Sequence, residues 1–558
     1  MKEKIIDFIK PVFQKLGYQE YLSISESEKA DYQINSAFAI AKINHVNPIE
    51  VAKEIEEGIK KLDLYEDYFK NVISVNPGFI NINVSDKLIN SFIKDFINNG
   101  FIKKTDSKEL YFLDYGGPNI AKPLHIGHLR PAIIGESFKR ILKAKGYNVI
   151  SDVHFGDFGL QIGEVIYGLL KENKRIDDIT LEYLNYLYPH MSKLCKEDEN
   201  ILKECKKVTY DFQHGNPEYQ KIYEKIKEVS LSDIKRLYNY LDVDFDLWLG
   251  ESDSRDYFEK MFNALEDKKI LELDNGEQIV RVKTENDNKE MPPVRLINNE
   301  GGVGYATTDI ATILKRNDEY HPDHIYYFAD SRQSLHFEGV FRVSKLLGVE
   351  CNLKHCPFGT INGSDGKPFK TRSGDAVSLN EILNMVKDSF LAKREDNKNM
   401  SISDLDKQVN AIIKYADLQN NREKNYNFDI TKFSEVSGKT GPYILYSAIR
   451  IRKILDNNEI ISTIISDNIY NEIDRALRLK LLDINKALDK AINEVLPSVI
   501  AEYIYDLCNI TNSFYQNINI NNITDINVKN DYLNILKLTY DVINACLNML
   551  IIKIPSEM

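Results

Sequence analysis

Apolar positions in the first hundred residues follow two different periods. Between Ile5 and Phe13 they recur at helical spacing, and a second helix is expected from Gln33 to Lys42. From Asn71 to Val84 the pattern predicts two short strands around a turn at Pro77-Gly78. These elements predict a small α/β domain over residues 1–107.

Beyond this domain, apolar runs alternate with amphipathic stretches. A buried strand is expected from Leu110 to Tyr115, and a helix follows it, with Ile134, Phe138, Ile141 and Leu142 on one face. Gly146 is a natural C-terminal stop for that helix, and Tyr147 to Val153 is expected to be the next strand. The three elements have the length of one βαβ unit.

The strand rhythm is then interrupted. Lys171 to Glu266 is charged and mostly helical in pattern, which predicts an insertion over about 171–266. Strand character returns at His324–Phe328 and near Cys356–Ile361. Alternating strands and helices are typical of a doubly wound, Rossmann-like parallel sheet, which we place in residues 108–432.

The last part of the chain predicts helices almost throughout. Two apolar faces repeat at helical spacing: Ile444, Leu445, Ala448, Ile451 and Ile454, and then Leu477, Leu481, Ile484, Ala487 and Ala491. The Asn-rich stretch Asn517–Asn530 is expected to be a loop between helices. Residues 433–558 are therefore expected to form an all-α helical bundle.

Composition narrows the classes of function. With 72 basic and 84 acidic residues the formal charge is −12, which argues against a nonspecific nucleic-acid coat but allows a local basic face for tRNA. No long uncharged apolar run is present, so no membrane association is expected. The six cysteines form no C-x-x-C pair and no zinc set, so we expect reduced thiols and no structural metal.

Candidate chemistry lies between the first strand of the sheet and its helix. His125 and His128 stand in a His-Ile-Gly-His run, preceded by Lys122 and followed by a helix whose N-terminus favours anions. Imidazoles donate to phosphate oxygens, Lys122 supplies a compact charge, and Gly127 allows close approach to the backbone. No P-loop motif occurs. Taken alone, the two histidines are better explained as polar residues at a helix end, and the flanking pattern is what favours a nucleotide site.

The surrounding blocks resemble those of arginyl-tRNA synthetases, a family of class I aminoacyl-tRNA synthetases, over nearly the whole chain. Gly117–Arg130 is similar to that family's extended HIGH signature. The other similar blocks are Asp31–Asn35, Gly156–Gly163, Gly304–Ile310, Asp330–His336, Asp365–Gly374 (the KMSKS-like loop), Gly441–Ala448 and Ile554–Met558. The order and spacing of these blocks are more specific than any one of them.

The resemblance implies an arginine–tRNA ligase that forms arginyl-adenylate from ATP, as its Mg²⁺ complex, and transfers arginine to the 3′ end of tRNA(Arg). It assigns catalysis to Lys122, His125, His128, Lys370 and Arg372. It assigns ATP binding to Pro123, His125, Gly127, His128, His336, Phe369 and Lys370. It also implies a cytoplasmic monomer. Catalysis would consist mostly of positioning and charge stabilisation on phosphate oxygens.

Selectivity for arginine calls for carboxylates, because a guanidinium presents five donors and stays charged. The resemblance assigns the amino-acid pocket to Asp114, Asn119, Tyr305, Asp309 and Gln333. Tyr305 and Asp309 are spaced i, i+4 and share a face if that segment is helical. A helix-terminal acid that complements the dipole is an equally good interpretation of Asp309 alone.

Three positions depart from the family pattern. Phe158 replaces a tryptophan, Arg372 stands where the second lysine of the KMSKS-like loop would fall, and Leu445 replaces a common glutamine. The resemblance implies that Lys122 takes over part of the charge of the missing lysine.

Contacts with tRNA are expected from Tyr443, Tyr446, Arg450 and Arg422. Basic residues also cluster at Arg475, Arg478 and Lys480. The tyrosines are equally well explained as residues of a helix interface, and a solvated surface is the default for Arg422.

Two other functions compete with the ligase. A catalytically inactive tRNA-binding paralogue would be expected to have lost some of Lys122, His125, His128 and Asp309. Another nucleotidyltransferase with this signature would lack the two flanking domains.

Overall fold

The computed structural model describes residues 1–288, 290–367, 369, 377–393 and 400–558. These residues form two compact units, each made of separate stretches of the chain. Unit 1 contains Met1–Lys103, Arg450–Lys486 and Asp506–Ile543, and unit 2 contains Lys104–Ile449, Ala487–Tyr505 and Asn544–Met558. No helix in the described part of the chain has the length and hydropathy needed to cross a membrane.

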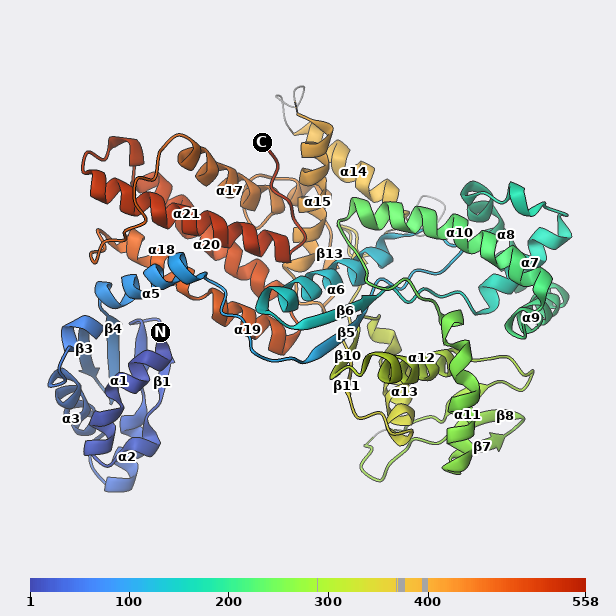
Figure 1. The fold of residues 1–558 in the computed structure, drawn as a ribbon, viewed down its shortest axis with the longest axis horizontal. Helices are drawn as coiled ribbons and strands as arrows, with labels where there is room; N and C mark the ends of the chain where they lie inside the picture. Colours follow the sequence, from blue (N-terminus) through green and yellow to red (C-terminus); the bar gives the residue numbers. More distant parts are fainter. Residues whose placement is uncertain (289, 368, 370–376, 394–399) are drawn as a thin grey trace. The chain divides into compact units, whose positions relative to one another are not determined.

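Unit 1 begins with the small α/β fold expected at the N-terminus (Figure 1). Its antiparallel sheet has the strand order β1-β2-β4-β3. The elements are α1 (Lys2–Lys15), β1 (Ile24–Glu26), β2 (Tyr32–Ile34), α2 (Ser36–Asn44), α3 (Pro48–Lys60), α4 (Tyr65–Tyr68), β3 (Phe69–Val75), β4 (Phe79–Val84) and α5 (Asp86–Asn99). The expected first helix and hairpin are confirmed. The helix expected from Gln33 was wrong at its start, because Gln33 and Ile34 pair with β4 and the helix begins at Ser36.

Unit 2 is organised around four parallel strands in the order β11-β10-β5-β6. The elements of this part are β5 (Leu110–Asp114), α6 (Ile126–Lys145), β6 (Asn148–Asp152), α12 (Tyr305–Tyr320), β10 (His324–Tyr327), α13 (Ser334–Leu346) and β11 (Asn352–His355). The expected βαβ unit is confirmed, and Gly146 ends α6 with a left-handed φ of 101°.

Alternate strand residues face opposite sides of the sheet, and both sides are covered. Phe112, Ile325 and Tyr327 belong to a core shared with α12 and α13. On the other side, Phe138 of α6 contacts the rings of Tyr326 and Phe328, with centroids 6.2 and 5.8 Å away. This is the doubly wound arrangement that the alternation predicted.

The strand expected near Cys356–Ile361 was placed too late. β11 ends at His355, and Pro357, which has no N–H to donate, lies two residues farther on. Only the two-residue strand β12 (Ile361–Asn362) lies at the end of the expected range, paired with β13 (Tyr426–Asn427).

The predicted insertion is mostly helical, as expected. The helix α7 (Leu160–Lys171) precedes the predicted range. The range itself contains α8 (Leu181–Glu197), α9 (Glu199–Gln213), α10 (Pro217–Tyr240), the 3-10 helix η3 (Glu251–Tyr257) and α11 (Phe258–Asp267). A three-stranded antiparallel sheet that the sequence analysis did not predict follows: β7 (Leu271–Asp274), β8 (Glu277–Val280) and β9 (Val294–Ile297).

Helices dominate the C-terminal part, as expected. Within the expected range 433–558 they are α17 (Gly441–Asp456), α18 (Glu472–Leu482), α19 (Ile484–Glu494), α20 (Ser498–Asn517) and α21 (Ile526–Met549). Three further helices precede it: α14 (Leu379–Ala392), α15 (Ile402–Leu418) and α16 (Ile430–Phe433). The Asn-rich loop is shorter than expected because α21 already begins at Ile526. The two compact units divide these helices between them.

Candidate active site

The chain reverses its strand order between β5 and β10, which places a topological switch point in unit 2. In open parallel sheets, ligands bind beyond the carboxyl ends of the strands at such a point. Asp114 is the last residue of β5, and His125 follows it at the start of α6. Gln333 and His336 follow β10. The topology therefore brings these four predicted residues to one end of the sheet.

The two histidines of the His-Ile-Gly-His run cap the helix α6. His125 is the N-cap, and its Nδ1 accepts a hydrogen bond from the Gly127 N–H at 3.0 Å. The Nδ1 of His128 accepts from the N–H of His125 at 3.2 Å, and the two rings lie 4.0 Å apart. A Cβ at Gly127 would lie 2.8 Å from the His125 ring, so glycine is required there.

These hydrogen bonds determine the tautomer of both rings, and the surroundings of the rings determine their charge. Burial lowers the pKa of His125, and the charge of Lys122 lowers it further. Burial, followed by His125 and Lys122, lowers the pKa of His128 to about 3. Both rings are therefore neutral near pH 7, with Nδ1 as acceptor and the proton on Nε2. Among the described residues neither Nε2–H has a recorded acceptor, so both remain as donors for an anion.

The loop before α6 is held by contact with the next strand connection. Asn119 pairs with Gly156, and the Ile120 N–H donates to the Gly156 carbonyl at 2.9 Å. A Cβ at Gly156 would lie 2.3 Å from Oδ1 of Asn119. Farther along this loop, Lys122 Nζ lies 4.7 Å from the ring centre of Tyr188 in α8. The insertion thus supplies a ring beside the lysine.

Asp114 already has a guanidinium partner within the protein. Arg316 of α12 binds Oδ2 of Asp114 at 2.8 Å and Oδ2 of Asp152 at 2.7 Å. Its side chain is 2% exposed and lies 4.6 Å from the ring centre of Phe112. Arg316 also donates to the Tyr327 hydroxyl at 3.1 Å. Sequence reasoning missed this residue because nothing in the pattern of α12 marks it as a partner of β5.

Asp309 also has a partner, but of a different kind. Its Oδ2 lies 2.5 Å from Nε2 of His336, which stands in the first turn of α13. Burial lowers the pKa of His336, but the hydrogen bond and charge of Asp309 outweigh burial and raise the pKa above its ordinary value. Tyr305 and Asp309 both lie on α12, so the conditional expectation of a shared helix face is met.

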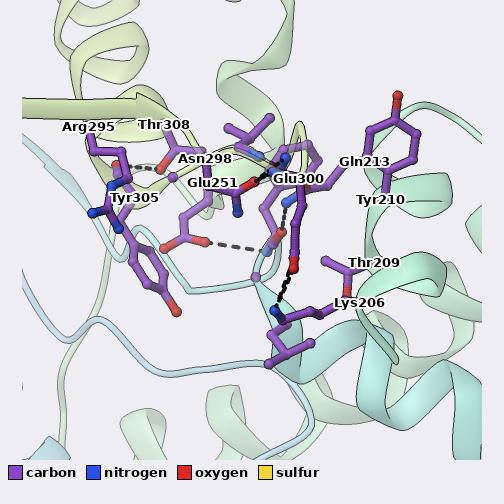
Figure 2. Close-up of a pocket in the computed structure, with 16 residues that line it drawn as sticks. Lys206, Thr209, Tyr210, Gln213, Glu251, Arg295, Asn298, Glu300, Tyr305 and Thr308 are labelled. Atoms are coloured by element: carbon purple, nitrogen blue, oxygen red, sulfur yellow. Dashed lines mark hydrogen bonds and ion pairs between the residues drawn. The ribbon is translucent and has the colours of Figure 1, made fainter. Parts of the chain in front are cut away.

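Tyr305 lines a pocket of 320 Å³ (Figure 2). The side chain of Tyr305 is 59% exposed. Glu251 of η3 lines the same pocket, and burial, followed by the charges of Asp157 and Asp309, raises the pKa of Glu251 to about 8. An ion pair of 3.0 Å between Lys206 and Glu300 lies across the pocket from Tyr305. Glu251 was missed because its Gly-Glu-Ser context carries no periodic signal.

Phe158, the residue that replaces tryptophan, packs as expected for an apolar ring. It is 3% exposed and lies 5.9 Å from Phe212 and 6.1 Å from Phe258, measured between ring centroids. The preceding Asp157 is buried and accepts from Ser252 Oγ at 2.7 Å and from the Tyr223 hydroxyl. This block therefore fixes η3, which carries Glu251.

Several predicted site residues need separate comment. Lys370 and Arg372 lie outside the described residues. Phe369 is described, and its ring lies 6.2 Å from that of Phe428. Pro123, Gly127 and Gln333 are exposed to solvent near the switch point.

The basic residues expected to contact tRNA are placed differently from the expectation. Arg422 is 4% exposed and donates to the carbonyls of Val495 at 3.0 Å and Pro357 at 2.5 Å, so its expected surface position is corrected. Arg478 is fully buried between Asp474 and Asp531 in unit 1. The acceptors of Arg422 are distant in the sequence, whereas Arg478 pairs both with Asp474, one helical turn before it, and with the distant Asp531.

The remaining tRNA candidates are more accessible. Tyr446 is 37% exposed on α17, whereas Tyr443 is half-buried with its ring 5.8 Å from that of Tyr505. In unit 1, the guanidinium of Arg450 lies 4.1 Å from the ring centre of Tyr515, which is 42% exposed.

Comparison with known families covers almost all of the chain. The family described as "tRNA synthetases class I (R), catalytic domain" matches residues 89–430. The "DALR anticodon binding domain" matches residues 444–558, and the "Arginyl tRNA synthetase N terminal domain" matches residues 1–84. Fold and strand-end site together are those of a class I aminoacyl-tRNA synthetase.

Curated relatives narrow this class. The arginine–tRNA ligase of Alkaliphilus oremlandii is 37% identical, over 100% of this chain and 99% of the relative. The arginine–tRNA ligase of Francisella tularensis subsp. holarctica is 36% identical, over 98% of each chain. The chain belongs to the arginyl-tRNA synthetase family, and the expected arginine–tRNA ligase function is confirmed over its full length.

Solved structures agree on the fold. The Thermus thermophilus arginyl-tRNA synthetase is 19% identical, covers 100% of both chains and has a TM-score of 0.81. The Plasmodium falciparum enzyme is 24% identical, covers 99% of both chains and has a TM-score of 0.78. The expected multidomain α/β architecture is confirmed.

Proposed function

We propose that this ligase activates L-arginine with ATP–Mg²⁺ at the switch point and then transfers it to the 3′-terminal adenosine of tRNA(Arg). The observation that carries the proposal is the pair of neutral imidazoles at the N-terminus of α6. The Nδ1 of each ring accepts a backbone hydrogen bond, and within the described part of the chain its Nε2–H has no acceptor. They stand where backbone N–H groups and the helix dipole also favour an anion.

In the first step, the arginine carboxylate attacks the α-phosphorus of ATP and pyrophosphate leaves. His125 and His128 donate from Nε2 to the oxygens that gain charge at the α-phosphate. A neutral donor suits this task because it requires no counter-ion and keeps its proton over the working pH range. Lys122 supplies the fixed charge for the leaving phosphates. Lys370, Arg372 and Phe369 are assigned to the same end of ATP, and Pro123, Gly127 and His336 to the adenosine side.

The arginine side chain is assigned to the end of the site formed by α12 and β5. Asp309 and Tyr305 receive the guanidinium, Asp114 and Gln333 line the pocket, and Asn119 holds the amino-acid end. In the second step, a hydroxyl of the terminal ribose attacks the adenylate carbonyl and AMP leaves.

The tRNA contacts proposed here are Tyr446, Tyr443 and Arg450. Base stacking on exposed aromatic rings is common for unpaired RNA. Arg422 is left out, because a phosphate would have to replace its two internal carbonyl partners. We assign tRNA contact to residues 1–107, catalysis to 108–432 and anticodon binding to 433–558. We further propose that the protein is a cytoplasmic monomer.

The test is ATP–pyrophosphate exchange with each amino acid, with and without tRNA(Arg). Exchange with arginine in the presence of tRNA is expected, and the tRNA is included because members of this family usually need it for activation. Exchange with another amino acid, or none with arginine and tRNA, would contradict the proposal.

A further inference from the structure

Each of the two acidic groups proposed for the arginine pocket has a cation of its own. Arg316 lies 2.8 Å from Asp114, and His336 lies 2.5 Å from Asp309. The charge of each carboxylate is therefore already partly balanced before a substrate guanidinium binds. The two internal cations differ in whether they can be discharged.

Arg316 stays charged at every pH that the folded protein tolerates, because a guanidinium does not lose its proton in proteins. It is 2% exposed and is held by Asp152 as well as Asp114. It cannot be displaced without leaving two carboxylates unpaired. The substrate must accept Arg316 as part of the pocket.

His336 has none of these restraints. Its side chain is 32% exposed, and within the part of the chain that the structure describes Asp309 has no second ionic partner. An imidazolium becomes neutral by losing a single proton from Nδ1. The Nε2–H can still donate to Oδ2 of Asp309, which leaves Oδ1 for a guanidinium.

The titratable groups around this pair come from three other elements. His355 of β11 repels the charge of His336, and its own pKa is lowered first by burial. The charge of Asp309 contributes to raising the pKa of both Glu251 of η3 and Tyr327 of β10. Burial raises the pKa of Tyr327 and keeps its phenol protonated, and Glu251 is largely protonated below about pH 8. Asp309 therefore carries the negative charge for which His336 and the substrate compete.

We propose that His336 is a proton-linked positioning residue, which neutralises Asp309 as an imidazolium until arginine binds and then releases its Nδ1 proton to solvent. The arginine guanidinium takes over as the counter-ion of Asp309, so the charge balances on both sides of the exchange. The inference rests on the proposed function, in which Asp309 is a ligand of the substrate guanidinium.

The proposal predicts that arginine affinity depends on pH. Below the pKa of His336, each bound arginine must expel one proton, so the Kd falls by up to about tenfold per pH unit as the pH rises. Above that pKa the Kd becomes constant. Because the pKa of His336 is raised, the rise in affinity extends above the pH at which an ordinary histidine titrates.

The experiment is isothermal titration of the full chain with L-arginine, between about pH 5.5 and pH 8, in pairs of buffers with different ionisation enthalpies. The difference between the buffers reports the protons released per arginine. The wild-type protein is expected to release close to one proton at the acid end and fewer as the pH rises. His336→Gln keeps an amide donor near Asp309 and is expected to bind arginine with no proton release and a flat pH profile.

Two matched variants identify the source of the proton. His355→Gln removes the neighbouring histidine, which does not contact Asp309, and should retain the release. Glu251→Gln removes the protonated carboxyl of the adjacent pocket and should also retain it. Circular dichroism confirms that each variant is folded.

The proposal is overturned if the release survives in His336→Gln, if it disappears in Glu251→Gln instead, or if the wild-type protein binds arginine without releasing protons. Failure to bind arginine at any pH would reject the assigned role of Asp309 in the proposed function, and the proton linkage with it. Binding without linkage rejects the linkage alone.

Discussion

Two cation–carboxylate contacts at one end of the sheet have opposite physical characters. Arg316 is buried between Asp114 and Asp152, with additional contacts to an aromatic ring and a hydroxyl. His336 meets one carboxylate, Asp309, and is open to solvent on one side. The first contact cannot be broken without leaving a buried charge. In the second contact, His336 becomes neutral when it loses one proton.

This difference indicates that the contact of Arg316 is mainly structural, whereas we propose that the contact of His336 faces the substrate. A buried guanidinium held by two acids fixes α12 against β5 and β6, so its main effect is on the folded structure. A partly exposed imidazole contributes little to stability but responds to charge that enters the pocket. We therefore expect acidic residues that were predicted together as substrate ligands to have different tasks.

Removal of Arg316 is expected to have the largest effect. Arg316→Met leaves Asp114 and Asp152 without their counter-ion and should lower the free energy of unfolding by about 3–5 kcal/mol. Urea denaturation followed by circular dichroism measures this. Arg332→Met is the matched control, because Arg332 is 83% exposed and, among the described residues, its ionic partner is Asp330 alone. Its loss should stay below about 1 kcal/mol. Equal losses in the two variants would remove the distinction between the contacts.

The sequence predicted the elements that carry this site better than it predicted the charges within it. The βαβ unit from Leu110 to Asp152 follows from apolar periodicity and from Gly146, which are local signals. The position of β11 was missed because Asn352, Lys354 and His355 are polar, so apolar periodicity does not mark this strand. The family blocks identified Asp309 and Tyr305, but not that Asp309 would have His336 as a partner.

Charges paired across long stretches of sequence could not be predicted. Arg316 lies about two hundred residues from Asp114, and α12 shows no pattern that points to β5. Arg478 and Arg475 looked like a basic surface for RNA, yet both are bound to aspartates of unit 1. Charge counts locate basic residues in the sequence but cannot say which of them already have a partner.

Substitution of the two carboxylates tests the distinction in function. Asp309→Asn should weaken arginine binding by about a hundredfold and leave ATP binding nearly unchanged, because it removes the charged partner proposed for the substrate guanidinium. Asp114→Asn should lower the free energy of unfolding more than Asp309→Asn does, because Arg316 loses one of its two acids. Equilibrium binding of each substrate and urea denaturation measure both quantities. If Asp114→Asn abolished arginine binding at unchanged stability, Asp114 would be a direct ligand rather than the counter-ion of Arg316.

His125 lies between these two extremes, since Nδ1 of its ring caps α6 and Nε2 has no partner among the residues that the structure describes. His125→Ala removes both roles and should lower stability by about 1 kcal/mol, whereas His125→Asn retains a good N-cap and should not. Both should reduce the rate of pyrophosphate exchange by about 10²–10³, because both lose the Nε2–H. Thermal unfolding and exchange rates separate the two roles. A normal rate in His125→Asn would show that the ring acts only as a helix cap.

The smallest effect is expected for the contribution of His336 to stability. Because folding raises the pKa of His336, its ion pair with Asp309 stabilises the protein fully below the unfolded pKa of about 6.5. The contribution is lost as the pH rises through the folded pKa. It should not exceed about 1 kcal/mol, since the pair is partly exposed. The difference in unfolding free energy between the wild-type protein and His336→Gln, followed from about pH 5.5 to pH 8.5, should therefore shrink towards zero. A difference that is constant or grows with pH would show that His336 is held by packing, and that its contact with Asp309 is as permanent as that of Arg316 with Asp114.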